Sequence, residues 1–162
     1  MRTFFSDPTG TKEELLAATY RALHQHGYTA LSLQTIGEEF PKSTSLIYHH
    51  YDSKDALVVD CLDAMLDQLE ANIPAEPSDP HASIAAFLTM IYADPDSEDY
   101  QFLRALTEIR GQAPHDDAFQ EQFRRADRIL QRRLETAIAA GVEREVFVVE
   151  NAERTANQLY TL

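Results

Sequence analysis

Apolar residues recur along this chain at intervals of three and four, which is the spacing of one face of an α-helix. The first such segment opens at Thr11, where Glu14 three residues later makes a capping-box pattern, and Gly27 is expected to end it. Only the short stretch EVFVVE at 145–150 alternates as a strand would. The pattern therefore predicts an all-α protein.

The predicted helices run over about 11–27, 33–40, 44–51, 54–72, 79–93, 97–110, 116–140 and from 151 onward. Ser32 and Asp79 are expected to be N-caps, and Gly111 and Gly141 are expected to end the sixth and seventh helices. The eighth pattern is still periodic at Leu162, so we expect the natural protein to be longer. The second and third helices are too short to be stable alone and must pack on their neighbours.

Composition narrows the class of protein. Hydrophobic residues make up 44% of the 162 positions, which argues against disorder. The sequence contains neither an apolar run of membrane-spanning length nor a secretory signal pattern, so a soluble, cytoplasmic protein is expected. Cys61 is the only cysteine, which excludes an intrachain disulfide and a multi-cysteine metal site.

The net charge of −13 at first argues against a partner with phosphate groups. However, residues 1–54 hold five Lys or Arg and six Asp or Glu, a net charge of −1, and the other 108 residues hold −12. The first third of the chain is thus nearly neutral. Three lysines against eleven arginines in an acidic chain also suit a cytoplasm of high salt, and we hypothesise a salt-adapted source.

The stretch STSLIYHHYDSK, residues 43–54, raises three possible kinds of site. A metal site is disfavoured because His49 and His50 point about 100° apart on a helix, and the chain has no HExxH spacing. Catalysis is disfavoured because Ser45, His49 and Asp52 would lie along one solvated surface without a Gly-rich turn to supply an oxyanion hole. No metal, cofactor or enzymatic activity is expected.

The third kind of site, a surface that reads nucleic acid, accounts for more of the residues. Two short helices joined by a tight turn form a helix-turn-helix, and the small residues 43–45 at the start of the second helix would let it enter a major groove. Tyr48 and Lys54 suit phosphate contacts, as does Ser32 with the free N–H groups of its helix start. A packed structural junction is the alternative, and the two roles are compatible: Ile47 and Tyr51 are expected to face inward. The list of residues expected to face outward is Tyr48, His49 and Lys54, and His50 is unassigned.

Residues 27–57, GYTALSLQTIGEEFPKSTSLIYHHYDSKDAL, resemble the helix-turn-helix signature of the tetracycline-repressor (TetR) family of transcriptional regulators. The resemblance is close over about residues 11–57, and beyond them it extends only to helix number and length. It implies a DNA-binding domain at 1–54 and a helical regulatory and dimerisation domain at 55–162. The residues expected to contact DNA are Ser32, Lys42, Ser43, Thr44, Ser45, Tyr48, His49 and Lys54.

Departures from the family pattern lie in the turn. Pro41 and Lys42 stand where the family usually has Gly and an aliphatic residue, so we expect a differently built turn in which Phe40 supplies an apolar contact. Gly37, where the family commonly has Ala, is expected to weaken its helix by about 0.5–1 kcal/mol.

The resemblance further implies a homodimer, a palindromic operator in double-stranded DNA, and a small-molecule effector that releases the DNA, hence a repressor. An apolar effector pocket is expected to be lined by Phe87, Met90, Ile91, Phe102, Leu106, Phe119 and Phe123, although for each of them taken singly a core position is favoured. The alternative function is a helical module that binds a small molecule or a protein without reading DNA. The cluster of five arginines at 124–133 is interpreted as a solvated stripe with local pairs Glu121–Arg125 and Glu135–Arg132, or else as a site for an acidic ligand or DNA.

Overall fold

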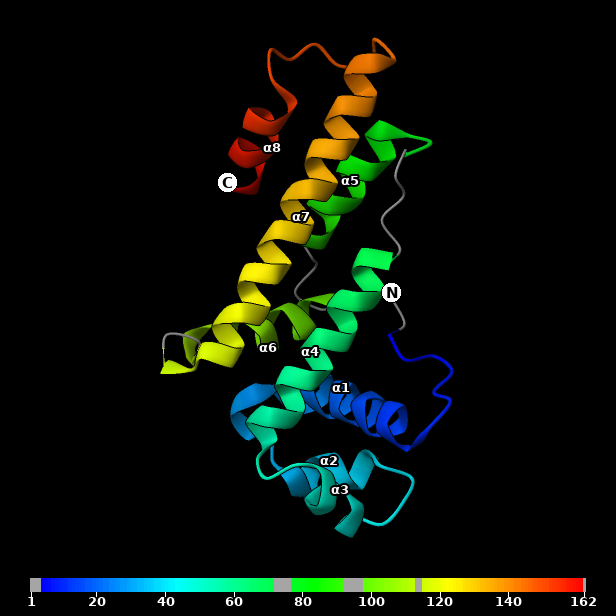
Figure 1. The fold of residues 1–162 in the computed structure, drawn as a ribbon, viewed down its shortest axis with the longest axis vertical. Helices are drawn as coiled ribbons and strands as arrows, with labels where there is room; N and C mark the ends of the chain where they lie inside the picture. The colour runs from blue at the N-terminus through cyan, green and yellow to red at the C-terminus, as the bar shows by residue number, and fades with distance from the viewer. Residues whose placement is uncertain (1–3, 72–76, 92–97, 113–114, 162) are drawn as a thin grey trace. The chain divides into compact units, whose positions relative to one another are not determined.

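The structure is a computed structural model of the 162-residue chain, and it describes residues 4–71, 77–91, 98–112 and 115–161. Within those ranges the chain forms helices and no strand, so the prediction of an all-α protein is confirmed. The helices are α1 (Thr11–Ala30), α2 (Leu33–Glu39), α3 (Ser45–His50), α4 (Lys54–Ala71), α5 (Pro80–Ile91), α6 (Glu98–Gln112), α7 (Asp117–Glu143) and α8 (Ala152–Tyr160) (Figure 1). None of these helices, over its described residues, combines the length and hydropathy that crossing a bilayer requires.

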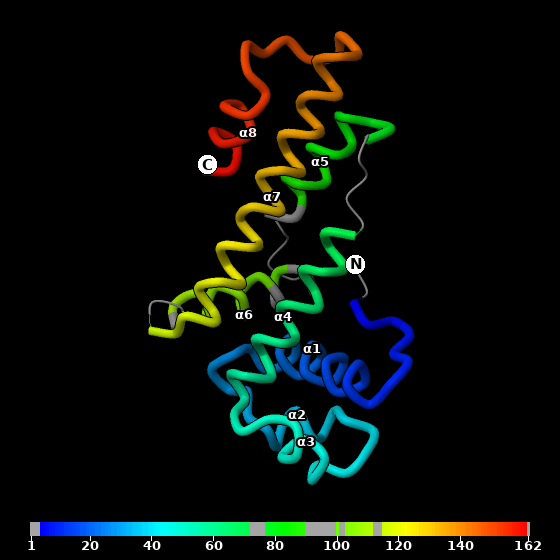
Figure 2. Tube along the Cα trace, in the orientation of Figure 1, coloured from blue at the N-terminus to red at the C-terminus, as the bar shows by residue number. Residues whose placement is uncertain are grey.

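The chain divides into two compact units. The first contains Met1–Gln68 and Asp94–Phe123, and the second contains Leu69–Ala93 and Arg124–Leu162, as the colours along the trace in Figure 2 allow the reader to follow. The resemblance implied two domains that meet at residue 54, and the division into these two units does not follow that boundary. The domain boundary at residue 54 therefore stays a prediction. The first unit holds the helix-turn-helix together with α6.

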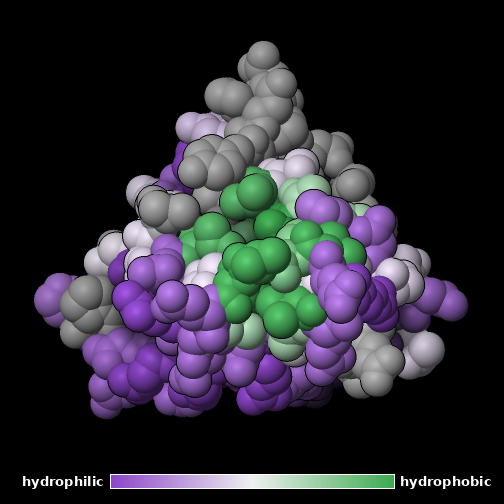
Figure 3. Space-filling view, turned by 90° about the horizontal axis from the view of Figure 1, so that it is seen from above, coloured by the Kyte–Doolittle hydropathy of each residue, from purple (hydrophilic) through white to green (hydrophobic). Residues whose placement is uncertain are grey.

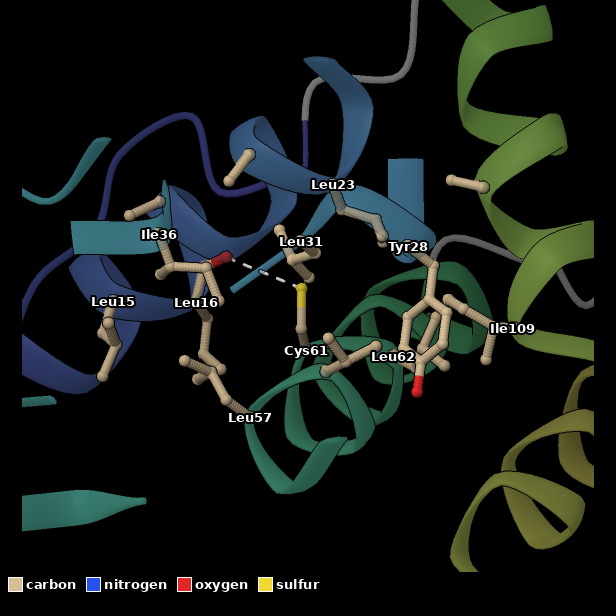
Figure 4. Close-up of a cluster of buried hydrophobic side chains, with 14 of the residues drawn as sticks. Leu15, Leu16, Leu23, Tyr28, Leu31, Ile36, Leu57, Cys61, Leu62 and Ile109 are labelled. Carbon is tan, nitrogen blue, oxygen red and sulfur yellow. Dashed lines mark hydrogen bonds between the residues drawn. The ribbon is translucent and has the colours of Figure 1, made fainter. Parts of the chain in front are cut away.

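The core of the first unit is built from the apolar faces of α1 and α4. Leu15, Leu23 and Leu57 are at most 1% exposed, and Figure 4 shows them in one cluster with Cys61, whose thiol donates to the carbonyl oxygen of Leu16 at 3.6 Å. The two short helices add one fully buried isoleucine each, Ile36 and Ile47. Burying a side chain of this size contributes about 1.5–3 kcal/mol, which is how a helix of six or seven residues is held in place.

The end of α1 is irregular, and it is held by α6. Gly27 adopts φ +71°, a conformation that favours glycine, and one further turn follows it as far as Ala30. Glu108 of α6 accepts a hydrogen bond from the backbone N–H of Thr29 at 3.0 Å, and its carboxylate oxygen would lie 3.0 Å from a Cβ on Gly27. The first helix was expected to end at Gly27; the structure has a kink at this glycine, and α1 ends at Ala30.

The second unit has a separate, smaller core. Phe87 from α5 packs there against Leu134 and Ile138 from α7 and Ala156 from α8. Two predicted starts are confirmed by cap hydrogen bonds: Asp79 accepts from the N–H of Ala82 at 3.0 Å, and Asn151 accepts from the N–H of Arg154 at 2.8 Å.

Three predictions about helix ends and starts were wrong. Gly111 and Gly141 do not end their helices, because α6 continues to Gln112 and α7 to Glu143. Gly141 is instead required by packing, since the ring of Phe147 occupies the space that a Cβ at this position would need. The capping box at Thr11 does not form either: Gly10 is the N-cap, without a side-chain cap, and Glu14 turns to another partner.

The stretch at 145–150 does not form a strand. It follows the end of α7, where Glu145 adopts φ +58° and the N–H groups of Val146 and Phe147 both donate to the carbonyl oxygen of Gly141. Figure 3 looks onto the molecule from the side on which α7 ends and shows apolar side chains inside a polar rim. The exposed large apolar residues near that end of α7 are Val142, Val146 and Val148.

Candidate nucleic-acid interface

Helices α2 and α3 form the predicted helix-turn-helix next to α1 (Figure 1). Ser32 is the N-cap of α2, as predicted, and its hydroxyl accepts from the N–H of Thr35 at 3.1 Å. The hydroxyl of Thr35 in turn accepts from the N–H of Ser32 at 2.9 Å, so two of the free donors at the helix start are satisfied reciprocally. The phosphate contact expected at Ser32 would therefore use the N–H groups that the cap leaves free, and it stays a prediction.

The turn between the two helices is closed by contact between Gly37 and Thr44. A Cβ at Gly37 would lie 2.8 Å from Cγ2 and 2.9 Å from Oγ1 of Thr44, which is closer than real Cβ atoms approach other atoms. Glycine at this position therefore lets α3 start directly against α2. This close contact is the structural reason for a residue that lowers the helix propensity of α2. Thr44 is half-buried as a result, while Pro41 is exposed and Phe40 is buried in the core, as expected.

The exposed polar groups gather at the start and along the outer side of α3. Ser43 and Ser45 are exposed, with their hydroxyl oxygens 2.7 Å apart, and the N–H of Ser45 donates to the Ser43 hydroxyl at 3.3 Å. Tyr48 is 60% exposed, and His49 and His50 are exposed as well. The helix thus presents hydroxyl, phenol and imidazole groups.

The inner side of α3 is fixed by burial and by one tyrosine. Ile47 is fully buried, and the hydroxyl of half-buried Tyr51 donates to Asp60 of α4 at 2.8 Å. Burial, and after it the hydrogen bond to Asp60, raises the pKa of the Tyr51 phenol, so this side chain stays a neutral donor. The inward positions proposed for Ile47 and Tyr51 agree with this arrangement.

Both lysines expected at the interface are anchored within the first unit. Lys42 forms an ion pair with Glu14 and donates to the hydroxyl of Thr11 at 2.9 Å, which ties the turn to the start of α1. The ammonium of Lys54 donates to the carbonyl oxygens of Tyr28 and Leu31, both at 3.1 Å. Lys54 thereby caps the last turn of α1, where a cation is favoured by the helix dipole.

The Lys54 ammonium also lies 4.4 Å from the centre of the Tyr28 ring. Of its three N–H donors, two go to carbonyl oxygens, and one is left for another acceptor. A phosphate contact at Lys54 is compatible with this geometry, and it stays a prediction. The sequence suggests an outward side chain at Lys54. It does not indicate that this side chain caps the last turn of α1.

The residues expected to line an effector pocket belong to two cores. Phe119 is 1% exposed in the core of the first unit, where its ring meets Tyr28 edge-on at 5.9 Å, and Leu106 and Phe123 are partly buried against the same core. Phe87 is 3% exposed in the core of the second unit. The side chains of Met90, Ile91 and Phe102 lie outside what the structure describes, so the pocket stays a prediction.

A surface hollow with a volume of about 490 Å³ lies along α8. It is lined by polar residues, namely Asn151, Glu153, Arg154, Asn157, Gln158 and Thr161. This composition differs from the apolar chamber that the sequence suggested for an effector.

The arginine cluster on α7 has a partner that the sequence did not indicate. Arg125 and Arg132 both reach Glu70 at the end of α4, at 3.2 and 3.3 Å. Glu70 lies more than fifty positions away in the sequence, so no local pattern could point to it. Within the described ranges, no group of three His, Cys, Asp or Glu side chains is arranged to hold a metal ion.

Two regions of the chain match families of known regulators. Residues 15–61 match the family described as bacterial regulatory proteins, tetR family, and residues 80–162 match the family described as BetI-type transcriptional repressor, C-terminal. An HTH-type transcriptional repressor of Streptomyces coelicolor is 25% identical over 119 residues, which are 74% of this chain and 62% of the relative. The chain thus spans less than two thirds of that curated relative.

Solved structures agree over nearly the whole chain. A TetR transcription regulator from Haloarcula marismortui is 36% identical, with a TM-score of 0.74 over 93% of this chain and 80% of the other. A transcriptional regulator from Pseudomonas aeruginosa PAO1 is 26% identical, with a TM-score of 0.63 over 97% of this chain and 78% of the other. The chain therefore belongs to the TetR family of transcriptional regulators, and the fold expected from the resemblance is confirmed.

We predict that Gly37→Ala destabilises the first unit by about 1–3 kcal/mol, because its Cβ would overlap Thr44. Gly111→Ala is the matched control, since nothing lies within 4 Å of a Cβ there, and it should stabilise by about 0.5 kcal/mol. Denaturant unfolding of both variants measures the difference. Adding Thr44→Ala should recover at least about 1 kcal/mol of the loss. Equal stability of Gly37→Ala and Gly111→Ala would contradict the close contact.

Proposed function

We propose that the protein is a DNA-binding transcriptional repressor that reads a palindromic operator with α3. The observation that carries the proposal is the set of exposed hydroxyl groups of Ser43 and Ser45 at the start of α3, above the fully buried Ile47. Short polar side chains at the start of a rigidly seated recognition helix suit base edges in a major groove. The proposed role is not catalytic, and it places the protein in the cytoplasm with its DNA.

The first test separates base contacts from phosphate contacts. Ser45→Ala should change the preference among operator variants by about 1–3 kcal/mol at one or two base pairs, because the hydroxyl contacts a base edge. Lys54→Ala should weaken binding to all duplexes similarly, because it removes a phosphate contact. Fluorescence anisotropy on a set of single-base operator variants measures both. If Ser45→Ala weakens every duplex equally, α3 is not the recognition helix.

We also propose a homodimer with a two-fold axis in which α8 contributes to the interface. A helix of six residues covers too few base pairs to be selective, whereas two copies would read half-sites about 34–36 Å apart. Analytical ultracentrifugation measures the oligomeric state directly. An obligate dimer should persist at about micromolar concentration. A monomer under those conditions, in the salt of the native cytoplasm, would refute the dimer.

A small apolar effector is proposed to release the DNA. Two connections could carry its effect within the first unit: α4, which begins at Lys54, and the contact from α6 to the end of α1 through Glu108. The second connection acts on the turn that leads into Ser32 and α2, because Glu108 holds the N–H of Thr29 three residues before it. An effector that displaces α6 would thus act on the segment that enters the helix-turn-helix.

The effector proposal requires coupling that is equal in both directions. A coupling of about 1–3 kcal/mol would change operator affinity about 5- to 150-fold, and operator DNA must weaken effector binding by the same factor. Calorimetric titration of an apolar compound found by thermal-shift screening, with and without operator, measures this. A charged replacement such as Phe123→Asp should abolish the response and leave DNA binding by the free protein largely intact. Equal effector affinities in the two titrations would show that no switch operates.

A further inference from the structure

The cations of the first unit that lie near the candidate interface are mostly neutralised by carboxylates. Residues 1–61 contain five Lys or Arg, of which the structure describes four. Three of these four form ion pairs within the unit. They are Lys12 with Asp60 at 3.1 Å, Arg21 with Glu39 at 3.2 Å, and Lys42 with Glu14.

Lys54 differs from the other three. Its hydrogen bonds go to two carbonyl oxygens, which carry no net charge, so its own positive charge is not cancelled by them. It keeps one N–H donor. Among the described cations of residues 1–61, Lys54 is thus the one that is anchored by neutral groups instead of a carboxylate.

The pairing has a consequence for binding to DNA. A cation that turns from its carboxylate to a phosphate leaves that carboxylate beside the DNA, so the pair as a whole neutralises no phosphate. Exposed acids Glu38 and Asp52 add to the negative charge around α3. The salt dependence of DNA binding counts the phosphates that are neutralised, at about 0.9 logarithmic units each.

We propose that this interface binds duplex DNA with an unusually shallow salt dependence, because only Lys54 of each protomer neutralises a phosphate. Affinity then comes from the hydroxyl, phenol and backbone N–H groups of α2 and α3, which release no counterions when they bind. The inference rests on the proposed DNA-binding function and specifies its chemistry. A dimer with one phosphate neutralised per protomer has a slope of about −2, and a dimer using all four cations has a slope of about −7.

The probe is a duplex of about 30 base pairs, recovered by the protein from a randomised library at moderate salt, with a scrambled duplex as competitor. All proteins carry Arg2→Gln, so that the remaining cations of residues 1–61 are the four described ones. Affinity is measured from about 0.1 to 2 M KCl at one fixed pH of about 8. We expect a slope between zero and about −4, with selectivity over the scrambled duplex kept at the highest salt.

Charge-matched variants test the pairing itself. Glu14→Gln leaves Lys42 without its carboxylate, and we expect the slope to steepen by about 2 per dimer, with tighter binding at low salt. Glu13→Gln makes the same change in net charge one residue away. The Glu13 carboxylate accepts hydrogen bonds from the N–H and hydroxyl of Thr9 and is not paired with a cation in the described part of the chain, so this variant should leave the slope nearly unchanged. Lys42→Gln should also leave the slope unchanged, while Lys54→Ala should bring it close to zero. Thermal melts establish that each variant is folded.

The outcomes separate the inference from the proposed function. A slope steeper than about −4 together with selective binding would overturn the shallow salt dependence and leave the repressor proposal standing. Equal slopes for Glu14→Gln and Glu13→Gln would overturn the role of the ion pair. If no duplex is recovered and no selectivity is seen at any salt, both proposals fail.

Discussion

Helices of seven and six residues do not persist in water, and α2 and α3 have those lengths. Their position depends on burial of Ile36 and Ile47 against the apolar faces of α1 and α4. Because the Ile47 side chain faces the core, the polar residues on the opposite side of α3 face outward. The candidate interface is therefore a consequence of the core, and its geometry can only be as well defined as the packing beneath it.

Helix α1 connects the helix-turn-helix to the rest of the first unit. Its first turn holds the turn of the helix-turn-helix through Lys42, its middle contributes Leu15 and Leu23 to the core, and its end receives Lys54 from α4 and Glu108 from α6. The same residues thus stabilise the fold and fix the position of α3. A displacement of α6 that breaks the Glu108 contact would remove a hydrogen bond and expose the last turn of α1 at the same time.

The sequence predicted features that depend on neighbouring residues. Ser32 and Asp79 cap their helices as expected, because a side chain of that kind needs only the backbone two or three residues ahead. The prediction from sequence was wrong at Gly141, which does not end α7. That position instead accommodates Phe147, a tertiary contact that helix propensity does not encode. The capping box at Thr11 failed for a related reason, because Glu14 is taken by Lys42, 28 positions later.

The candidate site was likewise predicted in part. Residue types and spacing indicated a helix-turn-helix and placed Ser43, Ser45 and Tyr48 on its outer side, and the structure shows all three exposed. The same spacing could not show that Thr44 packs on Gly37 or that Glu70 holds two arginines, since these contacts join segments whose approach is set by the whole fold. Glu108 was missed altogether, because an acid in the middle of an amphipathic helix carries no local signal of its partner.

The position of Cys61 has a practical consequence for measuring how often the first unit opens. Its thiol is fully buried between α1 and α4, and burial raises the pKa of that thiol far above the usual range (Figure 4). Since the thiolate is the reactive form, a thiol reagent can modify the side chain only in molecules whose core has separated. The chain has no second cysteine to react in its place. The rate of thiol modification therefore reports the opening of the core beneath α3, one event per molecule, without any engineered label.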